Sequence, residues 1–212
     1  MILKVINENC PQNHVCPSLK VCPAGALSQK GFNAPLVDTD KCIKCGVCVK
    51  FCPKKALILE QEINITRAEE NDLLEILDLQ KLAFRENALR YNDFSITPLT
   101  QTLEDITAQA KTHIILKAAD GSKIVGSVRG CKEGDYCTLS KLSVHPDYQN
   151  QGIGRKLIAA IENEFGIITF RFVTGYLDEK NISLYEKLGY KIYKNERIPN
   201  DVCSVFMEKK GT

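Results

Sequence analysis

The sequence has no apolar run that approaches the length of a membrane span, so no membrane-spanning helix is expected. It has no basic run, and its net charge is only +2 over 212 residues, which gives no reason to expect nucleic acid or an anionic membrane surface as a partner. The first residues lack the apolar stretch of a signal peptide, which predicts a cytoplasmic protein with reduced thiols. With 44% apolar and 25% charged residues, one large or two modest ordered domains are expected.

Ten cysteines stand out against this ordinary composition, and seven of them precede residue 53. Cys42, Cys45, Cys48 and Cys52 are separated by two, two and three residues, and a proline follows the last. Such short gaps let three thiolates converge on one iron–sulfur cluster while the backbone N–H groups between them point at its sulfides. A structural zinc site more often has two separated Cys-x2-Cys pairs, and disulfides require an oxidising compartment. The spacing therefore predicts an iron–sulfur site.

Residues 1–60 contain two similar halves, because Cys22-Pro23 repeats the pair Cys52-Pro53. With these motifs, the segment resembles the bacterial-type ferredoxin domain. The resemblance implies one 4Fe–4S cluster with four ligands: Cys22, Cys42, Cys45 and Cys48.

The first half departs from the ferredoxin pattern. Three positions where that pattern has cysteine carry other residues, namely Gln12, Val15 and Ser18. Cys10 and Cys16 flank His14 instead. Together with Cys52, and with or without the His14 imidazole, these thiolates would suit a second iron–sulfur cluster, a three-iron cluster or zinc. The alternative is that they are packed thiols and His14 is a surface residue.

The rest of the chain shows the periodicity of a mixed sheet with helices. The patterns predict strands at 63–67, 113–116, 124–128 and 138–144, with helices at 69–84 and 100–110 before and between them. They then predict a helix whose apolar face spans 157–165, a strand at 167–173, a helix at 181–188 and two final strands that end at 207.

A loop with two glycines, at 149–154, follows the predicted strand at 138–144 and precedes a helix. Backbone N–H groups at a helix N-terminus can bind a pyrophosphate, and glycine leaves room for its approach. The Rossmann pattern and the P-loop are both missing. The run Leu-x-Val-x-Pro followed by Gln-x-x-Gly-x-Gly resembles the acetyl-CoA loop of the GNAT superfamily of N-acetyltransferases. Asn181 and Tyr185, four residues apart on one helix face, match the next signature of that family.

The GNAT resemblance implies acetyl-CoA as co-substrate. The residues implied to bind it are Leu142, Val144, Gln149, Asn150, Gln151, Gly152, Ile153, Gly154, Arg155 and Asn181. An amine would attack the thioester directly, and Tyr185 would be the acid that protonates the leaving thiolate. Taken alone, without the glycine loop, Tyr185 would be interpreted as a core aromatic beneath the sheet.

The general base is less defined. Many family members carry a carboxylate on the strand before the loop, whereas Ser140 stands near that point here. A water-mediated base is therefore expected, with Glu133 and Asp135 in the preceding turn as candidates. The acceptor site is expected over residues 90–101, where four side chains are available to contact a substrate: Arg90, Tyr91, Asp93 and Gln101.

The sequence thus predicts an α+β protein: a small ferredoxin-like 4Fe–4S domain at 1–60, and at 61–212 an α/β GNAT domain with a mixed, mostly antiparallel central sheet. The first predicted function is an N-acetyltransferase that acts on a small-molecule or peptide amine, with the iron–sulfur domain in a redox, regulatory or structural role or in contact with a redox partner protein. The alternative is an electron-transfer or redox-sensing protein whose GNAT domain has become a binding module.

Overall fold

The computed structural model describes residues 1–60, 62–198 and 202–211, and it divides into two compact units, Met1–Glu62 and Ile63–Thr212. None of the helices in these described ranges is both long and apolar enough to cross a membrane.

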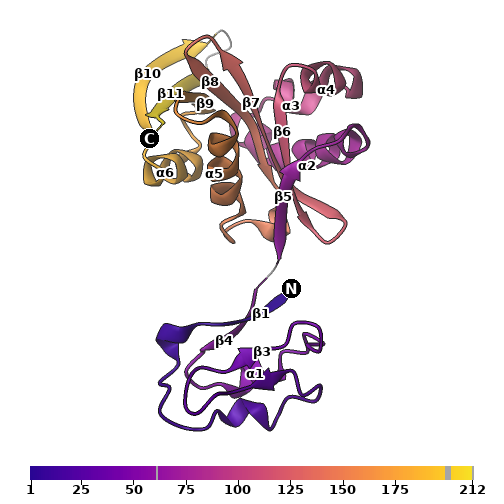
Figure 1. The fold of residues 1–212 in the computed structure, drawn as a ribbon. Helices are drawn as coiled ribbons and strands as arrows, with labels where there is room; N and C mark the ends of the chain where they lie inside the picture. The colour runs from indigo at the N-terminus through magenta and orange to yellow at the C-terminus, as the bar shows by residue number, and fades with distance from the viewer. Residues whose placement is uncertain (61, 199–201, 212) are drawn as a thin grey trace. The chain divides into compact units, whose positions relative to one another are not determined.

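The first unit is built from short elements (Figure 1). Strand β1 (Ile2–Val5) pairs antiparallel with β4 (Leu57–Glu60), and β2 (Leu27–Ser28) pairs antiparallel with β3 (Leu36–Val37). The only α-helix described in this unit is α1 (Val47–Phe51), and two 3-10 turns, η1 (Asn7–Asn9) and η2 (Pro17–Leu19), lie in the first half. The buried cluster is correspondingly small: Leu3, Leu27, Cys48 and Leu57. A core of this size gives little stability by itself, so a unit of this length usually needs a metal or another cross-link.

The second unit is organised around a seven-stranded sheet with the order β10-β11-β9-β8-β7-β6-β5. The strands are β5 (Ile63–Arg67), β6 (Ile114–Asp120), β7 (Lys123–Glu133), β8 (Tyr136–Val144), β9 (Thr169–Gly175), β10 (Lys191–Ile198) and β11 (Val202–Lys210). Neighbouring strands pair antiparallel except β8 and β9, which pair parallel. The prediction of a mixed, mostly antiparallel sheet is confirmed.

Helices cover both faces of this sheet (Figure 1). On one side lie α2 (Leu73–Tyr91), α3 (Thr97–Thr100) and α4 (Leu103–Ala110), and on the other lie α5 (Ile153–Phe165) and α6 (Glu179–Lys187). Two short 3-10 turns, η3 (Glu70–Asp72) and η4 (Pro146–Tyr148), precede α2 and α5. The larger buried cluster contains Leu157, Ile158 and Ile161 of α5, and a second cluster contains Ile76 of α2 and Ile106 of α4.

Helix α2 differs from its prediction at both ends. A capping box between Glu69 and Asp72 holds the chain in a 3-10 turn, so the α-helix begins at Leu73 and not at 69. The helix then continues past 84 to Tyr91 and ends at Asn92, which adopts the left-handed conformation with φ of +49°. The extension brings the last turn of α2 toward the functional site described below.

Gly126 on β7 lies under α5, where the packing leaves no room for a side chain. A Cβ at this position would lie 2.9 Å from Leu157 Cδ1 and 3.1 Å from Ile153 Cγ2, and both of these side chains are buried. We expect Gly126→Ala to lower the free energy of unfolding by about 1–3 kcal/mol, because overpacking displaces side chains that have nowhere to go.

Urea unfolding of the second unit, followed by far-ultraviolet circular dichroism, measures this cost. Gly154→Ala is the matched control, because a Cβ at Gly154 meets its nearest atom at 3.6 Å, an ordinary contact. Equal midpoints for the two variants would contradict the tight packing at Gly126.

Candidate functional site

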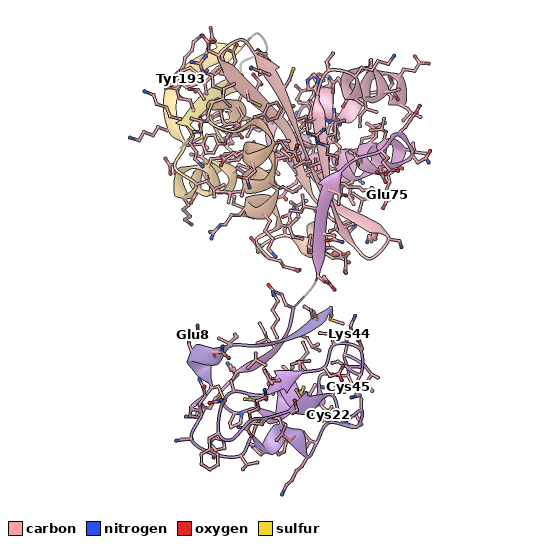
Figure 2. All side chains as sticks on the ribbon, viewed as in Figure 1. Glu8, Cys22, Lys44, Cys45, Glu75 and Tyr193 are labelled. Atoms are coloured by element: carbon pink, nitrogen blue, oxygen red, sulfur yellow. The ribbon has the colours of Figure 1, made fainter. Side chains whose placement is uncertain are left out.

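Four cysteines line one enclosed pocket in the first unit, and they are Cys22, Cys42, Cys45 and Cys48. The backbone N–H of Ala26 donates a hydrogen bond to Cys22 Sγ at 3.3 Å. The side chains of Leu3 and Leu59 close the pocket from the β1–β4 side. Figure 2 marks Cys22 and Cys45 within this unit. The fold thus brings together the four cysteines that the ferredoxin resemblance implies as cluster ligands.

These thiols have the number and kind that a 4Fe–4S cluster requires, because each of its four irons takes one thiolate. Across the described part of the chain, no three His, Cys, Asp or Glu side chains are placed to hold a single metal ion. A four-thiolate set with an apolar surround is also the donor set that such clusters require.

The residues of the predicted second site do not line this pocket. His14 is exposed, and its Nδ1 lies 2.7 Å from Asn13 Oδ1. Cys52 packs against the small core, whereas the backbone N–H of Cys16 is bonded to Gln29 Oε1 at 2.7 Å. Cys10 is partly buried. The second iron–sulfur or zinc site stays a prediction.

The glycine loop of the second unit connects β8 to α5 as the sequence predicts. Gly152 precedes the first residue of α5 and has a φ of +78°, a conformation that favours glycine. Gln149 Nε2 donates to the carbonyl of Val144 at 3.3 Å, and Gln151 Nε2 donates to that of Asp147 at 3.2 Å. These bonds fix the loop, whose residues 149–152 are exposed to solvent. The first N–H groups of α5, which have no partner within the helix, therefore begin at an accessible surface.

Strands β8 and β9 separate beside this loop. They pair through three residues only, from Tyr136 opposite Thr169 to Thr138 opposite Arg171. Beyond that point β8 continues to Val144 against β7, and β9 continues to Gly175 against β11. The separation opens the sheet between its two layers of helices.

A cavity of about 510 Å³ occupies this opening and reaches both faces of the sheet. The α2–α3 side contributes Phe84, Asn87, Tyr91, Asp93, Ile96, Thr97 and Pro98, and the α5–α6 side contributes Ile158, Asn181 and Tyr185. The strands contribute Leu139 to Leu142 from β8 and Phe172 to Gly175 from β9. Asn181 and Tyr185, which the GNAT resemblance implies as site residues, thus share the cavity.

Tyr185 belongs both to the core and to the cavity. Its ring packs on Phe172, with ring centroids 3.6 Å apart, and only 6% of the residue is exposed. Burial, and secondarily the charge of Asp178, raise the pKa of its hydroxyl above the usual value of tyrosine. The hydroxyl therefore stays protonated at neutral pH and is available as a proton donor.

Asp178, which the sequence did not single out, organises the opposite wall of the cavity. Its carboxylate is 4% exposed, forms an ion pair with Arg90, and accepts two bonds of 2.9 Å from Asn87 Nδ2. Thr174 Oγ1 donates to it at 3.3 Å. Arg90 therefore has a structural role as the ion-pair partner of Asp178. It does not line the cavity, so the structure does not place it where the suggested contact with a substrate requires.

Tyr91 and Asp93 do line the cavity, as the acceptor-site prediction requires. The Tyr91 hydroxyl accepts a hydrogen bond of 2.8 Å from the N–H of Leu177. Burial, followed by the charge of Asp178, raises the pKa of Tyr91 to about 12. This tyrosine therefore remains neutral in the working pH range.

Gln101 is buried and does not reach the cavity. It accepts from Gln80 Nε2 and from Arg129 Nη1, both at 3.0 Å. It also donates from Nε2 to Gln109 Oε1 at 2.9 Å. The suggestion that Gln101 contacts a substrate is therefore wrong, because all three bonds belong to a buried polar cluster between α2, α4 and β7.

The two candidate bases in the β7–β8 turn are also displaced from the cavity. Glu133 accepts a bond from the Tyr136 hydroxyl at 3.1 Å, and Asp135 lines a different, open groove on the surface. Neither residue lines the cavity that contains Tyr185. The turn lies before the first residue of β8, whereas the cavity is lined by the later residues of that strand. Nearness in the sequence was therefore a poor guide to the position of the base.

Lys141 also lines the cavity, although no sequence pattern indicated it. Lys141 and Leu142 together lie opposite Val128, so β8 bulges here, and Lys141 has a φ of +52°. Burial, and secondarily repulsion by Arg129, lower the pKa of Lys141 to about 8. No sequence pattern predicts a β-bulge in which a lysine adopts the left-handed backbone conformation.

Comparison with known proteins assigns both units. A family model described as "4Fe-4S binding domain" matches residues 35–58, and one described as "Acetyltransferase (GNAT) domain" matches residues 111–192. The chain carries a 4Fe–4S binding domain and a GNAT acetyltransferase domain. The GNAT match spans β6 to β10 and therefore includes the glycine loop, the separated strands and α6.

Individual relatives of the GNAT domain agree with this assignment. An acetyltransferase of Yersinia pestis (strain Pestoides F) is 32% identical over 82 residues, which cover 37% of this chain. The chain spans only 58% of that protein's length.

Two solved structures resemble the GNAT domain in fold. The ribosomal-protein-S18-alanine N-acetyltransferase of Escherichia coli has a TM-score of 0.60 at 19% identity, and the match covers 71% of this chain and 95% of that one. The PaiA N-acetyltransferase of Thermoplasma acidophilum, determined in complex with coenzyme A, has a TM-score of 0.58 at 20% identity, with coverages of 70% and 99%. At these identities the likeness establishes the fold.

Proposed function

We propose that the GNAT domain transfers an acetyl group from acetyl-CoA to an amine. The observation that carries the proposal is the cavity between β8 and β9, which reaches both faces of the sheet and contains Tyr185. Two substrates that enter from opposite faces can meet there, one as a thioester and the other as an amine. The acceptor is proposed to be a small-molecule or peptide amine.

The glycine loop and the bulge of β8 give acetyl-CoA its proposed binding site. The N–H groups of residues 151–155, at the end of the loop and the start of α5, would bind the pyrophosphate, because a helix N-terminus carries the positive end of the helix dipole. The backbone groups of Leu142 and Val144 would hold the pantetheine arm and polarise the thioester carbonyl, and Asn181 would contact the coenzyme from α6. Gly154 faces Leu142, Val144 and Leu184, so it lies on the path between loop and cavity.

Tyr185 is the proposed general acid. When the amine nitrogen bonds to the acetyl carbon and the carbon–sulfur bond breaks, the departing thiolate needs a proton, and the buried phenol can supply it. The amine must lose its own proton to water, since the candidate carboxylates of the β7–β8 turn lie elsewhere.

In the first unit, we propose a 4Fe–4S cluster bound by the four cysteines of the enclosed pocket. The chemistry that such a cluster supplies is transfer of one electron. A redox or regulatory role for it, and contact with a redox partner protein, are part of the proposal.

Gly154→Ala tests the coenzyme site without changing the core. Its Cβ fits the protein alone at 3.6 Å or more, so folding stability is expected to stay the same or to rise, by up to about 1 kcal/mol from helix propensity. Binding of acetyl-CoA is expected to weaken about tenfold or more, because the methyl group would project into the path of the ligand.

The measurement is stabilisation of the protein by acetyl-CoA in a thermal scan, followed by free thiol release during a screen of amine acceptors. Wild-type protein should bind and release thiol. Binding without thiol release for any amine would favour the alternative, a redox protein whose GNAT domain is a binding module. No binding of acetyl-CoA by the wild-type protein would defeat the proposal.

A further inference from the structure

The carboxylates that line the cavity are already compensated. Asp178 is ion-paired with Arg90 and accepts hydrogen bonds from Asn87. Asp93 Oδ1 accepts from the N–H and the hydroxyl of Ser95, at 2.8 and 2.6 Å. The two acidic groups of the cavity therefore have partners that neutralise or solvate them.

Two positive groups, Lys141 in the other wall and Arg129 buried behind it, are not compensated in this way. Arg129 is 1% exposed, and its guanidinium donates to three neutral amide oxygens, those of Gln80, Gln101 and Gln109. Its Nε atom is buried and has no hydrogen-bond partner in the part of the chain that the structure describes. Lys141, which lines the cavity, has no ion pair among the described residues. Lys141 and Arg129 therefore leave a positive charge without a counter-charge at this side of the cavity.

Amide oxygens solvate a guanidinium but leave its charge in place, and a buried charge without a counter-charge is costly. Arg129 pairs with Ser140 across the sheet, so it stands beside Lys141, and the two charges repel each other. Burial lowers the pKa of Arg129 to about 10. The titratable groups that face Lys141 are Asp93, Asp178, Tyr91 and Tyr185 across the cavity and Arg129 behind it. An anion that enters the cavity would relieve this imbalance.

We propose that the acceptor amine carries a carboxylate and that Lys141 binds this carboxylate in the cavity. This inference rests on the proposed acetyltransferase function and deepens it by naming the substrate class. Lys141 precedes Leu142, whose backbone is proposed to hold the thioester, so an acceptor anchored at Lys141 would present its amine beside the acetyl group. In the reaction the nitrogen–carbon bond forms and the carbon–sulfur bond breaks. The nitrogen loses one proton to water, the sulfur gains one from Tyr185, and the carboxylate stays unchanged.

Matched pairs of acceptors test this substrate class. Each of the common amino acids is compared with its own α-amide, which has the same side chain and amine but no carboxylate charge. With wild-type protein, at least one carboxylate form should exceed its amide about tenfold or more in kcat/KM, the effect expected of one charge-assisted hydrogen bond. Lys141→Met should bring that ratio close to one, and Lys141→Arg should restore the preference.

Two controls accompany the pairs. Lys111→Met removes an exposed lysine after α4, away from the cavity, and should leave the ratio unchanged. Calorimetric binding of N-acetyl amino acids against their amides, with coenzyme A present, gives a second reading that does not depend on turnover. There the carboxylate forms should bind more tightly to the wild-type protein than to Lys141→Met.

Equal binding and equal turnover of carboxylate and amide forms would overturn the inference, as would a carboxylate preference that survives in Lys141→Met. Stoichiometric acetylation of Lys141 itself, seen as mass added to its peptide, would also overturn it, because the lysine would then be an acceptor and not an anchor. If acetyl-CoA binds and amides are preferred, only the substrate class is wrong. If acetyl-CoA neither binds nor is consumed, the acetyltransferase function fails and this inference fails with it.

Discussion

Cys45→Ser is expected to abolish the iron–sulfur cluster. Cys45 lines the enclosed pocket with Cys22, Cys42 and Cys48, and each iron of a 4Fe–4S cluster takes one thiolate, so serine would leave one iron without its ligand. Iron and acid-labile sulfide, measured after anaerobic purification, should fall from about four of each per chain in the wild-type protein to nearly none.

The same variant should lose the fold of the first unit. That unit buries few apolar side chains, and the free energy of cluster binding acts as folding free energy in such small domains. Limited proteolysis is expected to cut between residues 1 and 60 in Cys45→Ser while the second unit stays intact. The second unit has its own two buried clusters, and none of the proposed cluster ligands belongs to it.

Cys52→Ser is the matched control, since Cys52 lies four residues beyond the proposed ligand Cys48 but does not line the pocket. It should keep one cluster per chain. If Cys52→Ser removes iron in excess of four per chain, Cys52 belongs to a second site with Cys10 and Cys16. Full iron content in Cys45→Ser would contradict the proposed ligand set.

Local patterns predicted most of the fold, because a helix or strand that buries one face requires apolar residues at its own period in the sequence. The spacing of Leu73, Ile76 and Leu77 predicts a helix that buries one face, and these residues are buried in α2. The alternation along 124–128 and 138–144 predicts strands, which lie in β7 and β8. Both domains of the chain were recognisable for the same reason, since their motifs are short and contiguous.

The walls of the cavity could not be predicted in this way. Asp178 meets Arg90 and Asn87 across about ninety residues of sequence, and nothing local to any of the three indicates the others. Gln101 was suggested as a substrate contact only because it lies in the segment 90–101, where the acceptor site is expected. Its actual partner, Arg129, comes from a strand that reaches it only when the sheet has formed.

Lys141, in the bulge of β8, could not be predicted because its backbone conformation goes against local preference. A left-handed φ at Lys141 is unfavourable for a side chain with a Cβ, so propensity argues against it. The conformation is set by the register of β8 against β7, in which two residues oppose one. Departures from local preference often mark functional positions, and this one lies at the cavity wall.

Tyr185→Phe is expected to lower kcat/KM for acetyl transfer about a hundredfold, the usual contribution of a general acid. Among the described residues, none forms a hydrogen bond with the Tyr185 hydroxyl, so its removal should not disturb the core. The ring remains and keeps its packing on Phe172. The change therefore separates the two roles that the sequence left open for this residue, a proton donor and a core aromatic.

Three measurements decide between these roles. Thiol release gives kcat/KM, a thermal scan gives the stability, and calorimetry gives the affinity for acetyl-CoA. Tyr193→Phe is the matched control, because it removes the same hydroxyl from a half-exposed ring on β10 that lies outside the cavity (Figure 2). A loss of rate at unchanged stability and affinity identifies the acid. A loss of stability in Tyr185→Phe with no change of rate would make Tyr185 a core residue, and water would then have to protonate the thiolate in the opening between β8 and β9.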